Sequence, residues 1–408
     1  MKIFKKLSVA ACLVALTAPA QAADSFTDAL IGGTASGDFR FRIKFSDTVG
    51  KRLNAYSVTL RSRLTYETAD WNNFSALIEP EDVSIIGQDR YNTTTNGKSQ
   101  YPLVADAPGT EMNRAFIQYI PQAETKIRYG RQWLEFDHQR FVYKADWRQH
   151  SQTFDAFTVI NTSVPDVKIH YGRVTHVNRL YGDESPYGNA DINSHFLNIT
   201  INKYKAAKTI LFAYLNEYQN GDYPGPSDFL RFTPERSHQT LGIDVGGPIP
   251  LNDDWTLLYK VSGAVQSPYA DSTITQSVHW YHLRLGFSYK GYTALLIKEQ
   301  FSNDNGYTFN VPFFPEFLNQ KGINFDGVNI EGLALQKKWG DKLVVKGGFR
   351  QFTTYHSGKD LGEDTDLYIE YFLTKNYRVG TRLTLYNHVE RDVYTDAKKA
   401  SVWFRFTF

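Results

Sequence analysis

Basic side chains recur at every second position in several segments of this 408-residue sequence, and they limit the chemistry to be expected. A guanidinium group stays protonated and binds carboxylates or phosphates through a planar fork of donors. Groups of this kind bind and steer anions. The basic residues that share the alternating phase, or that lie in one dense polar segment, are Arg40, Arg42, Arg61, Arg63, Arg131, Arg140, Arg148, Arg284, Lys346, Arg350 and Arg382.

The dense polar segment is 129–157, YGRQWLEFDHQRFVYKADWRQHSQTFDAF, in which arginine, aspartate and glutamine alternate with aromatics. Arg131, Arg140, Arg148 and Asp155 are the residues of interest in it. Two interpretations stand side by side. These side chains could line a solute pathway, or they could form a self-satisfied cluster that pins a loop, and both can hold together.

Patterns for catalysis or metal binding are sparse. The sequence contains neither G-x-S-x-G nor H-E-x-x-H, and its ten histidines show no ligand spacing. Ser151 follows His150, but a positioned acid and oxyanion donors are not apparent. The one cysteine, Cys12, lies in the apolar start of the chain. We therefore predict no enzyme, no catalytic residues, no metal ligands and no cofactor.

The alternation of side chains predicts β-strands with two different faces. In SGDFRFRIKFSD, Phe39 and Phe41 face one way, and Arg40 and Arg42 face the other. Aromatics make up 15% of the residues, and Tyr or Phe often ends an apolar row, as in the aromatic girdles of a membrane barrel. The same phase places Lys298 on the charged face. Similar alternation is found in 56–67, 281–290, 342–352, 366–387 and 401–408.

The links between the candidate strands alternate between short and long. Roughly 18 strands of about 9–13 residues can be counted, long enough for a tilted strand to cross a bilayer. We predict an all-β fold, a transmembrane antiparallel up-and-down β-barrel with short periplasmic turns and long extracellular loops. The long links are expected at 83–112, 134–151, 176–193, 218–236 and 303–325, and a Gly- and Pro-rich turn at 246–253.

A barrel of this size is too wide for its own side chains to fill, so its charged face should border water. For any single arginine, a partner acid in the wall is the simpler interpretation. The excess of inward basic charge over inward acid nevertheless favours anions, because rings of arginine and lysine select for them.

The start of the chain predicts export. Residues 1–22 have a basic start, an apolar run and the cleavage pattern Ala20-Gln21-Ala22, as in a signal peptide. Its three lysines leave 42 of 45 basic residues against 43 acidic ones, so the mature chain is close to neutral and nucleic acid is not an expected partner. Residues 23–408 show no linker and are predicted to form a single barrel domain in the bacterial outer membrane.

The segment 129–157 resembles the alginate-export family of outer-membrane barrels through GRQ, DHQRF, WRQ and QTFDAF, in that order. Weaker resemblance extends to EMNRAFIQY (111–119) and to 362–383. The resemblance implies an 18-stranded monomeric barrel whose basic lumen passes anionic polysaccharide. It also implies that the 134–151 link folds into the lumen and narrows it.

The combined prediction is a passive channel for anionic solutes such as uronate-type sugars, oligosaccharides or polysaccharide. The alternative is a non-conducting barrel that acts as a surface-binding protein or a membrane hydrolase. Expected partners are outer-membrane lipid, lipopolysaccharide and an anionic saccharide or carboxylate. A carboxy-terminal Phe408 in the apolar phase resembles the signature of outer-membrane proteins generally, which implies the barrel-assembly machinery as a further partner.

Overall fold

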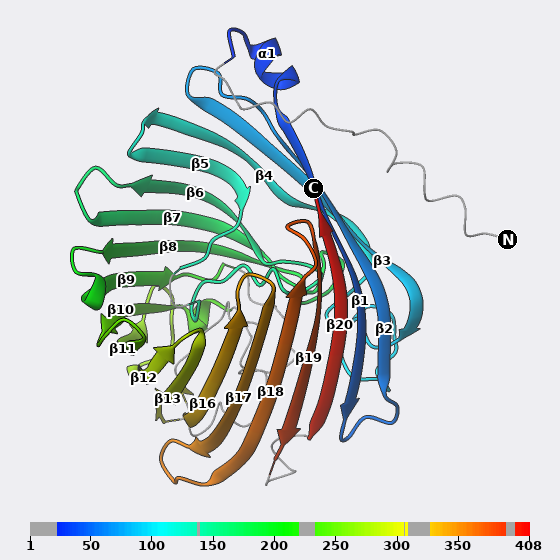
Figure 1. Cartoon of the computed structure of the whole chain (residues 1–408), viewed down its shortest axis with the longest axis vertical. Coiled ribbons are helices and arrows are strands. Elements are labelled where there is room, and N and C mark those ends of the chain that lie inside the picture. The colour runs from blue at the N-terminus through cyan, green and yellow to red at the C-terminus, as the bar shows by residue number, and fades with distance from the viewer. Residues whose placement is uncertain (1–22, 137–138, 220–232, 306, 309–326, 389–395) are drawn as a thin grey trace, which may run out of the picture.

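The structure is a computed structural model, and the predicted signal peptide, 1–22, lies outside the residues that it describes. Among the described residues no helix is long and apolar enough to span a membrane. One short helix, α1 (Phe26–Ile31), precedes the first strand at the end of the molecule where both termini of the barrel lie (Figure 1). The residues described are 23–136, 139–219, 233–305, 307–308, 327–388 and 396–408.

The described residues form one 18-stranded sheet, as the alternating pattern predicts, and Figure 1 shows the strands following one another around a ring. Two more strands, β14 (Asn303–Asp304) and β15 (Tyr307–Thr308), pair only with each other. The all-β, antiparallel, up-and-down architecture is confirmed. The strands of the sheet are β1 (Thr34–Thr48), β2 (Ala55–Glu67), β3 (Phe74–Arg90), β4 (Gly109–Gln122), β5 (Thr125–Gln132), β6 (Thr153–Asn161), β7 (Val167–Asn178), β8 (Asn189–Ile201), β9 (Lys208–Asn216), β10 (His238–Pro250), β11 (Trp255–Pro268), β12 (Val278–Tyr289), β13 (Tyr292–Phe301), β16 (Val328–Trp339), β17 (Leu343–Thr354), β18 (Asp360–Phe372), β19 (Tyr377–Asn387) and β20 (Ala397–Thr407).

The ring closes between the first and last strands. Strand β1 pairs with β2 on one side and with β20 on the other, and Phe41 stands opposite Phe404. The backbone N–H of Phe408 donates to Gly37 O at 3.1 Å. Because the last strand has a partner on each edge, the apolar alternation at the carboxy terminus needs only an apolar solvent on its outer face.

Short and long connections alternate around the ring, but some predicted boundaries were wrong. The predicted loop 83–112 is shorter, because β3 continues to Arg90 through register shifts at its pairings with β2 and β4. The predicted turn 246–253 is mostly strand. A Cβ at Gly247 would lie 2.3 Å from Lys205 O, so the glycine permits the short 3-10 helix η1 (Lys205–Ala207) to abut the strand.

The other predicted loops differ in how far the structure describes them. The link between β5 and β6 is 133–152, close to the predicted 134–151, and the link predicted at 176–193 is reduced to 179–188. The predicted links 218–236 and 303–325 fall largely outside the described residues.

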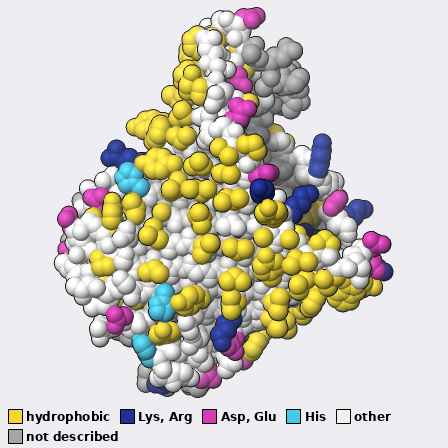
Figure 2. All heavy atoms as spheres, turned by 90° about the vertical axis from the view of Figure 1, so that its left-hand side faces the viewer, with side chains coloured by type: hydrophobic (Ala, Val, Ile, Leu, Met, Phe, Trp, Pro, Cys, Tyr) yellow, Lys and Arg dark blue, Asp and Glu magenta, His cyan; other side chains and the backbone are white. Residues whose placement is uncertain are grey.

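The outer face of the sheet is covered with apolar side chains. Figure 2 shows them across the side of the ring, with charged side chains towards the rims. Outward side chains such as Leu241, Val261, Leu283 and Leu296 are not covered by other parts of the protein. This exposure is expected of side chains that contact lipid.

Replacing Leu283 with arginine tests whether this face borders hydrocarbon. We expect Leu283→Arg to lower the free energy of unfolding in phospholipid vesicles by about 2–4 kcal/mol, the cost of a charge near the bilayer midplane. The measurement is a denaturant titration. Leu283→Ala is the control for lost apolar surface, and equal losses for the two variants would show that lipid does not contact this side chain.

Candidate channel constriction

The loop between β5 and β6, residues 133–152, folds into the ring and packs against its far wall. Phe141 lies 5.4 Å from Phe212 of β9 and 5.3 Å from Trp280 of β12, measured between ring centroids. Phe136 stacks on Tyr214 at 5.5 Å. The loop and the inward faces of β8, β9, β12 and β13 therefore share one buried apolar cluster inside the barrel.

A polar contact secures the same part of the loop. Arg140 Nη2 lies 2.5 Å from the Glu299 carboxylate of β13, and the Trp280 indole N–H donates to that carboxylate at 2.8 Å. Glu299 is buried. Its charge is compensated by Arg140, as a buried carboxylate requires.

The other end of the loop is held by arginines of β1, β2 and β20. Arg61 donates to Asp146 Oδ1 at 3.1 Å, and Arg63 bonds to the same oxygen. Arg405 approaches the second carboxylate oxygen at 3.6 Å. Arg40 donates to the backbone carbonyls of Asp146, at 2.5 Å, and of Trp147, at 2.8 Å. The Asp146 carboxylate of the loop therefore lies among several guanidinium groups of the barrel wall.

Burial makes this contact strongly electrostatic. Arg61 and Arg63 are 0% and 1% exposed, so their charges depend on protein partners rather than on water. Burial alone would raise the pKa of Asp146, but Arg61, Arg63 and Arg40 hold that pKa far below its ordinary value of 3.8. The aspartate stays ionised throughout the physiological range.

A second loop, 91–108, is fastened beside the first. Arg42 bonds to Asp106 of this loop and donates to Trp147 O at 3.2 Å. Burial opposes the ionised form of Asp106, but Arg42 and Lys44 lower its pKa below the ordinary value. Arg42 therefore links β1 to both inward-folded loops.

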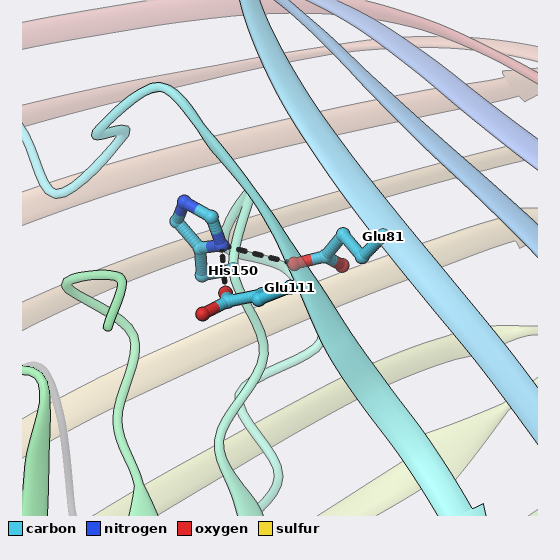
Figure 3. A group of neighbouring side chains, drawn as sticks. All are labelled: Glu81, Glu111 and His150. Atoms are coloured by element: carbon cyan, nitrogen blue, oxygen red, sulfur yellow. Dashed lines mark hydrogen bonds and ion pairs between the residues drawn. The ribbon is translucent and has the colours of Figure 1, made fainter. Parts of the chain in front are cut away.

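His150 forms a third attachment of loop 133–152, drawn in Figure 3. Its Nδ1 lies 3.0 Å from Glu81 of β3 and also bonds to Glu111 of β4, while Nε2 lies 2.7 Å from Ala107 O. Burial opposes the charged imidazole, but the two carboxylates raise its pKa well above the ordinary value.

The neighbouring serine is engaged elsewhere. The Ser151 hydroxyl donates to Asn113 at 2.6 Å and accepts from the Trp133 indole at 3.0 Å. Within the described residues the Ser151 hydroxyl and His150 are not hydrogen-bonded to each other. This geometry gives no support to a serine nucleophile activated by His150.

The remaining predicted site residues lie along the wall and are mostly paired with acids. Arg131 of β5 is bidentate with Asp155 of β6, which stands opposite it in the sheet. Arg350 is bidentate with Asp364, at 2.7 Å for both contacts. For these arginines the interpretation as wall-stabilising pairs is the better supported one.

Two other members of the predicted set, Arg382 and Arg148, lie against the ring of Trp147 in the loop. Arg382 pairs with Asp366 at 2.8 Å and also lies 5.7 Å from the Trp147 ring of the loop. Arg148 stacks over the same ring at 4.0 Å.

Arg284 and Lys346 project inward from β12 and β17, as predicted. Arg284 is half-buried. Lys346 is exposed and lies 5.4 Å from the Tyr368 ring, and no acid among the described residues lies within ion-pair distance of it.

The prediction for Lys298 was wrong. Lys298 faces outward on β13, next to the exposed Leu296, and pairs with Glu331 of β16 at 2.9 Å. The local sequence ALLIKEQF is apolar in both phases, so period two could not fix the orientation. Sequence reasoning also missed Asp106 of loop 91–108 and Glu81 of β3, because no spacing rule joins either acid to its arginine partner.

Comparisons with known proteins add to this geometry. The model of the alginate export family matches residues 34–322. The chain belongs to the alginate export family. This membership and the closed barrel place it in the bacterial outer membrane as a channel-type protein in contact with lipid. A comparison with curated proteins finds no match.

Solved structures of the same fold are distant in sequence. OpdQ of Pseudomonas aeruginosa has 12% identity and a TM-score of 0.69, covering 92% of this chain and 98% of its own. OccAB2 of Acinetobacter baumannii has 11% identity and a TM-score of 0.70, with the same coverage. OpdK of Pseudomonas aeruginosa, solved with vanillate, has 11% identity, a TM-score of 0.68 and again the same coverage. These similarities concern the fold.

Removing the charge of Asp146 tests how the loop is held. In Asp146→Asn we expect the amides of 144–149 to exchange with deuterium about 100-fold faster, because losing one partner of a buried ion pair costs about 3 kcal/mol of local stability. The measurement is hydrogen exchange on the folded barrel. Asp364→Asn, which breaks a wall pair, is the matched control and should leave these amides unchanged.

Acid provides an independent check on the same anchor. Since the pKa of Asp146 is lowered on folding, its contribution is present in full above about pH 3.8 and is lost only as the pH falls through the lower folded value. Protection factors of 144–149 should therefore persist from pH 7 to about 4. A loss of protection between pH 7 and 5 would contradict this assignment.

Proposed function

We propose that the protein is a passive outer-membrane channel for anionic solutes such as uronate-type sugars, oligosaccharides or polysaccharide. The observation that supports this proposal is the inward-folded loop 133–152, which is anchored to a wall rich in basic side chains. Loops that narrow a barrel interior leave a path whose charged lining controls which ions pass.

The charge balance at the loop anchor supports anion preference. Arginines outnumber acids in the network that holds Asp146, and Lys44 lies on the same inward face of β1. The guanidinium groups of this network belong to Arg40, Arg42, Arg61, Arg63 and Arg405, and the carboxylates that they contact belong to Asp38, Asp106, Asp146 and Glu81.

The buried arginines and the exposed lysine have different roles in this proposal. Arg40, Arg42, Arg61 and Arg63 hold the loops and act on the solute through their electrostatic field, because they are buried. Lys346 is exposed and meets the solute directly. The similarity to OpdK, which was solved with the aromatic carboxylate vanillate, is consistent with a carboxylate solute.

The proposed partners follow from the same surfaces. Outer-membrane lipid covers the apolar face, with lipopolysaccharide in the outer leaflet, and the strand that ends at Phe408 is the segment offered to the barrel-assembly machinery. We also propose a monomer as the functional unit; β1 and β20 close the ring within one chain, so no second copy is needed to complete the barrel.

Ion selectivity of the purified channel tests the proposal. We expect wild-type protein in a planar bilayer to prefer anions under a salt gradient, and Lys346→Gln and Lys346→Glu to shift the reversal potential progressively towards cations. Lys298→Gln removes the same charge from the outer face and should shift nothing. A barrel that passes no current, or one in which the two glutamine variants behave alike, would contradict the proposal.

A further inference from the structure

Three side chains with metal-binding atoms converge behind the constriction. Glu81 comes from β3, Glu111 from β4 and His150 from loop 133–152, and one donor atom from each lies within 4.8 Å of the others. Figure 3 shows both carboxylates directed at the same ring nitrogen. Glu81 and His150 are almost completely buried, whereas Glu111 is partly exposed.

The orientation of His150 is fixed from outside this triad. Its Nε2 lies 2.7 Å from the backbone carbonyl of Ala107, which can only accept, so Nε2 carries a hydrogen. This arrangement, with a backbone carbonyl behind one ring nitrogen, is typical of histidines that ligate metals through the other. Nδ1 and two carboxylate oxygens then face one another, and a positive charge is required among them.

Asp183, in loop 179–188, brings a further carboxyl group to the site. Its backbone N–H donates to Glu111 Oε2 at 3.3 Å. An acidic residue beside Glu111 adds to the negative charge that attracts a cation. Asp183 is exposed, so the site has a route to solvent.

The neighbouring arginines do not supply the positive charge that is required between His150 Nδ1 and the two carboxylate oxygens. Arg63 bonds to Glu81, but through the oxygen that faces away from His150, and it is also bound to Asp146. Arg131 is bidentate with Asp155. The atoms that face His150 Nδ1 are therefore not the ones taken by these arginines.

We propose that Glu81, Glu111 and His150 form a binding site for a divalent transition metal of the zinc type. One imidazole nitrogen with two carboxylate oxygens suits Zn²⁺, whereas Ca²⁺ and Mg²⁺ prefer sites made of oxygen alone. Asp183 lies at the entrance and attracts the cation. The bound ion displaces the proton of Nδ1, so its affinity falls as the pH is lowered.

The ion would join elements that are far apart in the sequence. It links β3 and β4 to loop 133–152 and, through the bond of His150 to Ala107, to loop 91–108. This inference does not depend on the channel being anion-selective, because it concerns occupancy of a site in the folded barrel.

Equilibrium dialysis of the full-length folded barrel against Zn²⁺, Ca²⁺ and Mg²⁺ tests the proposal. We expect one equivalent of Zn²⁺ per chain at pH 7.5, weaker binding at pH 5.5, and no stoichiometric Ca²⁺ or Mg²⁺. His150→Gln and Glu111→Gln should each weaken Zn²⁺ binding at least ~tenfold, since even outer-shell changes cost about that much.

The control is His176→Gln. His176 also pairs with a carboxylate, Asp191 at 2.6 Å, but stands apart from the triad, so this variant should bind Zn²⁺ as the wild type does. Heat-dependent gel mobility reports whether each variant is folded. If folded wild-type protein binds no stoichiometric Zn²⁺, or if His176→Gln loses as much as His150→Gln, the site holds a proton only and the proposal is overturned.

Discussion

Peptide groups in hydrocarbon find no water to bond with, so a strand that crosses a membrane must be paired along both of its edges. This chain meets the constraint by joining β1 to β20, with the last residue bonded to Gly37. Closure also determines which way side chains can point. Each strand then offers one face to lipid and the other to the interior, and the alternating sequence follows from that division.

The interior created by closure is occupied by the protein's own loops. Loop 133–152 is held at two places by different means. Its aromatic part packs against β9 and β12, and its acidic part is bound by Arg40 of β1 and by Arg61 and Arg63 of β2. Disrupting either the apolar packing or the buried ion pairs costs free energy, so the two attachments together hold the loop inside the barrel.

The sequence was sufficient for the fold because period two is a local signal that many strands repeat. It was sufficient for the inward direction of Arg40, Arg61, Lys346 and Arg350, which alternate with clear apolar neighbours. It failed at Lys298, where both phases are apolar.

The alternating pattern could not predict which side chains contact one another inside the barrel. Arg61 and Asp146 are 85 positions apart in the sequence, and Glu81 and His150 are 69 apart. These residues meet because the loops fold back into the barrel, and no regular spacing in the sequence indicates their contacts. The dense segment 129–157 did signal a loop of consequence. That this loop is fixed across the barrel interior is visible only in the folded structure, because an arginine that lines a pathway and one that holds a loop look alike in sequence.

The most direct test of the division between lipid and water is thiol labelling along β17. The only cysteine of the sequence is Cys12, in the predicted signal peptide, so introduced thiols report alone. With Lys346→Cys and Val345→Cys in barrels reconstituted in vesicles, the account predicts that an impermeant charged reagent labels the first and spares the second. Equal labelling at both positions would contradict it.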